Sequence, residues 1–323
     1  MKKKIIIGIH GLGNKPPRRL LRAWWKRSIY DGLSRIGHPQ KFFRFDLAYW
    51  AHFYYPKPLK LSVKDKNSPF YIENPYAPHQ PNGEVEPPSE LRKKSLDLIE
   101  RIFDKIFFSD NKIFHIDSIG DLIIRKFFRE LDIYYHQNCL VDSKSGIGAR
   151  DAIRQEVAQT LQKHRNKDIL LIAHSMGSIV AYDVLTQVLS DLPIHTFITM
   201  GSPLGLPVIM KKILSEQHKS IQEEKKVPTP ENIRNAWYNF SDLHDKIALN
   251  YNLNDDYKEN SYGVGPVDFV VSNDYTYENV KNPHKSYGYL RTPQVAEVIQ
   301  QFLMTGRPVL YREIKNRIRR WIA

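Results

Sequence analysis

One stretch of the chain, residues 168–182, constrains the fold more than any other. Residues 169–173 form an uninterrupted apolar run, which is typical of a parallel strand that is buried on both faces. From Ile179 onward, apolar residues recur at the spacing of a helix: Ile179, Val180, Val184, Leu185, Val188 and Leu189. Ser175 is therefore expected on a tight turn between a buried strand and a helix.

A serine on such a turn has the setting of a nucleophile elbow, whose usual pattern is G-x-S-x-G. Ala173 stands in place of the first glycine and Gly177 matches the second, so both flanking residues are small. The turn lifts the serine hydroxyl above the sheet edge and directs the Met176 N–H toward a developing oxyanion. Because five-residue motifs also occur by chance, an ordinary strand-turn-helix is the alternative.

The rest of the chain alternates strand and helix patterns, which predicts an α/β fold with a mostly parallel sheet and helices on both faces. We expect strands near residues 4–10, 41–50, 194–200, 235–240 and 267–271. We expect further helices near residues 16–36, 148–164, 208–226 and 293–302. The whole chain, 1–323, is interpreted as a single domain.

Residues 52–140 differ in character, because they are aromatic, rich in proline and irregular, with helical patterns only near 91–108 and 119–135. Irregular segments of this length often serve as lids or binding regions. We interpret residues 52–140 as an insertion that covers the C-terminal edge of the sheet as a lid. A packing layer without a role in binding is the alternative.

Polar residues follow several of the expected strands, at the edge where ligands bind in open α/β sheets. They are His10 and Gly11, Ser175, Asp242 or Asp245, and His284. A serine hydroxyl needs a histidine to take its proton and a carboxylate to orient that histidine. The chain order of serine, aspartate and histidine suits this kind of sheet.

With these motifs in place, the chain resembles the α/β-hydrolases of the lipase and esterase type. The resemblance covers roughly residues 1–51 and 141–305. It is carried by five motifs: residues 9–13, 173–177, 201–205 and 237–247, and an isolated histidine ahead of the last helix.

The resemblance implies a catalytic triad of Ser175, Asp245 and His284, with an oxyanion hole made by the backbone N–H groups of Leu12 and Met176. It favours Asp245 as the acid, because family members place that residue just before a small apolar pair. Asp242 is the alternative acid, or it caps the turn. His284 is one of twelve histidines and could instead be an ordinary surface residue.

Other polar residues near these motifs are expected to be structural. Ser202 lacks the small-residue frame of an elbow and precedes Pro203. His10 and His174 flank the site without a place in the triad. We find no metal-ligand spacing and expect neither a metal nor a cofactor.

These features predict a serine hydrolase that cleaves acyl bonds, with carboxylic esters of a small-molecule or lipid-like substrate as the expected class. Thioester and amide cleavage would use the same groups. The alternative hypothesis is an inactive protein that retains the fold for binding or membrane docking.

The net charge of the 323-residue chain is +13, a balance that can indicate nucleic acid or an anionic membrane. No nucleic-acid motif accompanies the charge, so we expect no nucleic-acid partner. The single cysteine, Cys139, permits no internal disulfide and favours a cytoplasmic protein. The sequence has no apolar run long enough to cross a membrane.

The C-terminal residues 307–323 form a basic amphipathic pattern, with apolar residues at 310, 314, 318 and 321–322. Such a helix can lie in a membrane interface. It can equally dock on the protein's own core. We therefore hold peripheral membrane contact as a hypothesis for this segment.

Overall fold

The computed structural model describes residues 2–79, 131, 133–135, 148–217, 226–248 and 251–304. Its centre is a six-stranded sheet in the order β2-β1-β3-β4-β6-β8, in which every neighbouring pair is parallel. The strands are β1 (Lys4–Ile9), β2 (Phe45–Ala48), β3 (Asp168–His174), β4 (Ile194–Met200), β6 (Ile233–Ser241) and β8 (Pro266–Val270). The predicted fold class is thus confirmed.

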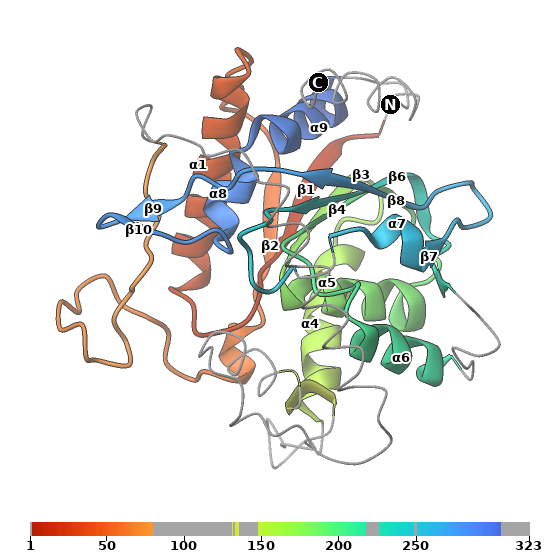
Figure 1. Cartoon of the computed structure of the whole chain (residues 1–323), viewed down its shortest axis with the longest axis horizontal. Coiled ribbons are helices and arrows are strands. Elements are labelled where there is room, and N and C mark those ends of the chain that lie inside the picture. Colours follow the sequence, from red (N-terminus) through yellow and green to blue (C-terminus); the bar gives the residue numbers. More distant parts are fainter. Residues whose placement is uncertain are drawn as a thin grey trace.

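Helices cover both faces of this sheet (Figure 1). One face carries α1 (Arg18–Arg35), α8 (Ser286–Leu290) and α9 (Pro293–Met304). The other carries α4 (Ala149–Gln162), α5 (Met176–Asp183) with its π-helical continuation η3 (Val184–Val188), and α6 (Pro207–Glu216). The sheet therefore separates two layers of helices, as the sequence patterns predict.

Each face of the sheet has its own apolar core. Along β1, Ile5, Ile7 and Ile9 pack on the side of α4 and α5, whereas Ile6 packs with α1 and α9. Successive side chains of a strand point to opposite faces, so a sheet covered on both sides needs apolar residues at consecutive positions. The uninterrupted apolar runs of β1 and β3 have this cause.

Strand β2 is shorter than predicted. The alternating side chains at 43, 45, 47 and 49 are buried as expected, but the strand itself spans only Phe45–Ala48. The carbonyls of Phe45 and Leu47 face away from β1 and accept hydrogen bonds from Arg22 and Arg18. The edge of the sheet is therefore closed by arginine side chains of α1.

Helix α6 also ends earlier than predicted, at Glu216 rather than Lys226. Its buried residues stop at Leu214, and Lys226 lies in a bend; residues 218–225 are outside the described residues. Several small elements carry no clear sequence pattern: η1 (Ala51–Phe53), α7 (Leu253–Asp256), the pair β5 (Val227–Pro228) and β7 (Tyr257–Lys258), and the pair β9 (Thr276–Tyr277) and β10 (Val280–Lys281).

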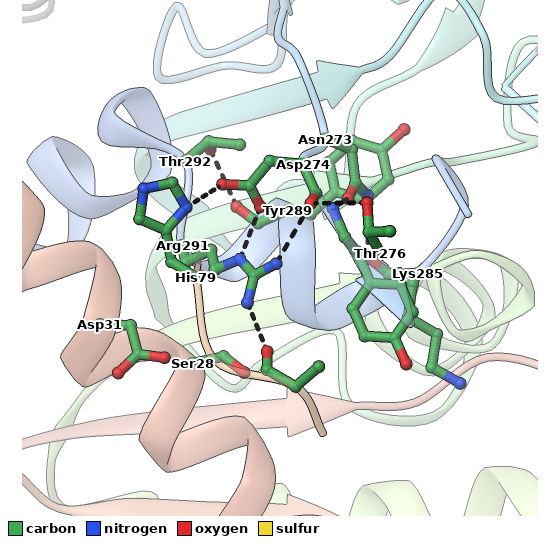
Figure 2. Close-up of polar contacts among 12 residues, drawn as sticks. Ser28, Asp31, His79, Asn273, Asp274, Thr276, Lys285, Tyr289, Arg291 and Thr292 are labelled. Carbon is green, nitrogen blue, oxygen red and sulfur yellow. Dashed lines mark hydrogen bonds and ion pairs between the residues drawn. The ribbon is translucent and has the colours of Figure 1, made fainter. Parts of the chain in front are cut away.

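The described first part of the insertion, residues 54–79, contains no helix or strand. It is fastened to the loop after β8, because the Tyr275 hydroxyl donates to the Pro75 carbonyl over 2.6 Å. The buried Arg291 donates to Asp274 (Figure 2) and to the Ala77 carbonyl. Asp274 also pairs with Arg35. The predicted helices at 91–108 and most of 119–135 lie outside the described residues, so the lid remains a prediction.

The C-terminal segment 307–323 also lies outside the described residues, and so do both interpretations of it. None of the helices that the structure describes is long and apolar enough to cross a membrane.

Candidate active site

Ser175 occupies a strained turn between β3 and α5. Its backbone has φ 55° and ψ −134°, although it is not a glycine. The turn packs closely against the loop after β1, because a Cβ on Gly177 would lie 2.6 Å from the His10 carbonyl oxygen. A left-handed serine closely packed against the first strand's loop is what the nucleophile-elbow prediction requires.

The structure brings three of the predicted site residues into one hydrogen-bonded line. His284 Nε2 lies 3.0 Å from Ser175 Oγ. On the other side of the ring, His284 Nδ1 lies 2.9 and 2.8 Å from the two carboxylate oxygens of Asp245. Ser175 and Asp245 are each only 1% exposed. The three residues come from separate loops, at the ends of β3 and β6 and just before α8.

The Asp245 carboxylate is held by two more hydrogen-bond donors. The Ile247 N–H donates to one oxygen over 2.9 Å, and the Tyr289 hydroxyl donates to the other over 2.8 Å. Tyr289 in turn accepts the backbone N–H of Asp242 over 2.9 Å. These contacts fix the orientation of the Asp245 carboxylate toward His284.

Gly201, at the end of β4, makes this arrangement possible. Its φ is +53°, and a Cβ there would lie 2.6 Å from an Asp245 carboxylate oxygen and 3.2 Å from His284 Nδ1. The sequence analysis counts residues 201–205 among the motifs of the resemblance but assigns no such contact to Gly201. No sequence motif predicts that Gly201 or Tyr289 contacts Asp245.

We expect Tyr289→Phe to lower ester turnover about tenfold, because one hydrogen bond to the carboxylate is lost and the Asp242 N–H loses its acceptor. Turnover and the pH profile of kcat/KM are to be measured together. A shift of the acid limb of that profile is expected if Tyr289 acts through Asp245 on the histidine. A loss of thermal stability with unchanged specific activity would contradict this positioning role.

Asp242 lies elsewhere in the network. Its carboxylate accepts the N–H of His244 over 2.7 Å and that of Asn273 over 2.6 Å, so it caps its own turn. The Asn273 side chain donates to the carbonyls of Pro283 and Lys285, the two neighbours of His284. Asp242 thus supports the histidine loop indirectly, through Asn273, whereas Asp245 contacts His284 itself.

His10 and His174 are both buried and both hold loops of the site. His10 Nδ1 donates to the Gly11 carbonyl over 2.8 Å, and its Nε2 accepts the Trp50 N–H over 3.1 Å. His174 Nε2 donates to the His284 carbonyl over 2.7 Å. Burial lowers the pKa of His10 to about 3 and the pKa of His174 well below its ordinary value. Both rings are therefore neutral near pH 7.

The predicted oxyanion donors belong to the loop after β1 and to the start of α5. The Leu12 N–H belongs to the same planar peptide as the Gly11 carbonyl, so the His10 bond to that carbonyl also fixes the direction of the N–H. Met176 is the first residue of α5 and is buried beside the elbow. The role of these two N–H groups remains a prediction.

A cavity of about 900 Å³ opens above Ser175 and His284. Its apolar wall includes Trp24, Phe70 and Tyr287, which come from α1, the insertion and α8. A groove of about 860 Å³ beside β2 is lined mainly by basic side chains and includes none of the predicted site residues. Within the described part of the chain, no group of three or more His, Cys, Asp or Glu is placed to hold a metal ion.

Comparison with known proteins bears on the same region. Residues 148–301 match a family model described as a PGAP1-like alpha/beta domain. The chain is an α/β-hydrolase-fold protein. The matched region of this hydrolase fold includes Ser175, Asp245 and His284, whereas Leu12 precedes it. No match to the chain is found among curated proteins.

Proposed function

We propose that this α/β-hydrolase-fold protein is a serine hydrolase that cleaves carboxylic esters of small or lipid-like substrates. The observation that carries the proposal is the line of contacts from Asp245 through His284 to Ser175. The strained elbow and the cavity add support, because Ser175 lines a cavity of the size that takes a small ligand.

In the proposed reaction, Ser175 Oγ bonds to the ester carbonyl carbon while His284 Nε2 takes the hydroxyl proton. The resulting oxyanion accepts hydrogen bonds from the Leu12 and Met176 N–H groups. The carbon–oxygen bond to the alcohol then breaks, and His284 returns the proton to the departing alcohol. An acyl group remains on Ser175.

Deacylation repeats these steps with water. Water attacks the acyl carbon as His284 takes one of its protons, the bond to Ser175 Oγ breaks, and the serine recovers the proton. Asp245 accepts the His284 Nδ1–H throughout, which keeps the ring in the required tautomer and stabilises the imidazolium. A thioester or amide could enter the same cycle, but the proposal is for esters.

The proposal is tested by labelling the purified protein with a fluorophosphonate probe, which reacts with activated serines. We expect one adduct, on Ser175, located by peptide mass spectrometry. Heat-denatured protein should not react, and Ser202→Ala is a matched control that should retain labelling. Failure of the native, folded protein to react would favour the inactive binding protein instead.

A further inference from the structure

Lysines dominate the charge of the cavity above Ser175. Among the described residues that line it, four are lysines, Lys15, Lys57, Lys66 and Lys285, and one is acidic, Glu73. Lys66 is paired with Glu278 at 2.6 Å, and that carboxylate is not among the lining residues. Three further lysines and one glutamate remain, so the described residues that line the cavity carry a net positive charge.

Lys285 is the lysine of this lining that directly neighbours a predicted triad residue in the sequence. It follows His284 directly, and its backbone carbonyl is held by Asn273 at 2.8 Å. Its ammonium lies 5.3 Å from the centre of the Tyr287 ring. Figure 2 shows the Lys285 side chain pointing away from Arg291. The side chain is partly buried, and this burial lowers the pKa of its ammonium to about 8. The group remains mostly protonated at pH 7.

Lys15 adds a second charge from the loop after β1. Its ammonium donates to the carbonyls of Leu12 and Gly13, which belong to the predicted oxyanion loop. The charges of Lys15 and Lys285 both contribute to lowering the pKa of His174, the residue before the elbow serine. The two ammonium groups, which are 270 positions apart in the sequence, therefore both act on the surroundings of His174.

We infer that the substrate is an ester that also carries an anionic oxygen group, a carboxylate or a phosphate, which binds Lys285 while an apolar part lies against the aromatic wall. A partly buried cation gains most from a charged acceptor that excludes water with it. Tyr287 and Phe70 supply the apolar contacts in the same cavity. This inference rests on the proposed esterase function and specifies its substrate class.

Matched esters test the inference. The neutral reference is ortho-nitrophenyl butanoate. One charged partner carries a carboxylate on the phenol ring, para to the nitro group, and the other is the ortho-nitrophenyl monoester of adipic acid. The measured quantity is the ratio of kcat/KM for each charged ester to that for the neutral ester. The two charged esters distinguish an anion on the alcohol side from one on the acyl side.

We expect Lys285→Met to lower this ratio roughly ten- to hundredfold for at least one charged ester, as for the loss of a hydrogen bond to a charged group. Lys285→Arg should restore most of the ratio. Glu73→Gln should raise it, because the substrate anion then meets no like charge. Lys64→Met, which makes the same change in net charge outside the cavity lining, is the matched control and should leave the ratio unchanged.

The wild-type protein supplies an independent measurement, in case a variant does not fold. Added sodium chloride should lower the ratio, because about 1 M salt reduces the screening length to about 3 Å. If neutral ester is hydrolysed but neither salt nor Lys285→Met changes the ratio, the inference is wrong and the esterase proposal stands. If no ester is hydrolysed, the proposed function fails and the inference fails with it.

Discussion

Ser175→Ala is expected to abolish ester hydrolysis, with a loss of kcat on the order of 10⁴- to 10⁶-fold. The change removes the Oγ atom that lies 3.0 Å from His284 Nε2 and leaves the backbone of the elbow in place. Alanine accepts the left-handed turn no worse than serine, because both side chains begin with the same Cβ. Turnover of ortho-nitrophenyl butanoate and the melting temperature should be measured on the same preparation.

The wild-type protein is the reference for both measurements, and Ser202→Ala is the variant control. Ser202 Oγ contacts Ser178 Oγ rather than His284, so its loss should leave turnover largely intact. A folded Ser175→Ala protein that still turns over the ester would exclude Ser175 as the nucleophile. In that case the cavity would have to hold a different catalytic group.

Asp245→Asn is expected to have the second largest effect, a loss of kcat of about 10⁴-fold, or about 5 kcal/mol of transition-state stabilisation. An amide facing His284 Nδ1 can donate a hydrogen bond there, which favours the ring tautomer whose Nε2 cannot accept the serine proton. The substitution also removes the negative charge that stabilises the His284 imidazolium. The shape of the side chain is preserved, so the protein should fold.

Asp242→Asn is the matched comparison, because the two aspartates lie in the same loop and are equally buried. We expect a much smaller loss, about tenfold, since the Asp242 carboxylate does not contact His284 and acts on its loop through Asn273. Single-turnover kinetics would show whether either change acts on the chemical step. If Asp242→Asn proves the more damaging, the acid of the triad is assigned to the wrong residue.

The fold could be predicted from sequence because the strands have distinctive patterns. The uninterrupted apolar run of β3 and the helical spacing from Ile179 mark a strand-turn-helix before any coordinates exist. Element ends were less accessible. Residues 41–44 continue the alternation of β2, yet the strand begins only at Phe45, although the Ile6 N–H still donates to the Arg44 carbonyl. Alternation reflects which side chains are buried and does not locate the end of a strand.

The site could be predicted as far as its motifs extend along the chain. Ser175 has a local signature, and the order of serine, aspartate and histidine narrows the partners. Tyr289 and Gly201 escaped sequence reasoning because their importance lies in distances across the fold, to a carboxylate 44 residues away in one case. Likewise, Asn273 holds the His284 loop by bonding backbone carbonyls, a contact that leaves no residue-type pattern.

The substrate cavity was the least accessible feature. Its aromatic wall and its lysines come from the loop after β1, from α1, from the insertion and from α8 with the loop before it, which are far apart in the sequence. No spacing rule connects Lys15 with Lys285. Their common location becomes visible only when the histidine loop folds back over the carboxyl ends of the strands.

The arginines that close β2 also limit how this molecule can associate with others. An outer strand with open carbonyls is a template to which a second polypeptide can add by backbone hydrogen bonding. Here an added strand would have to displace the Arg22 side chain from the Phe45 carbonyl and the Arg18 side chain from the Leu47 carbonyl. Growth of the sheet across this border, whether into a continuous dimer or into an aggregate, is therefore opposed by α1 itself.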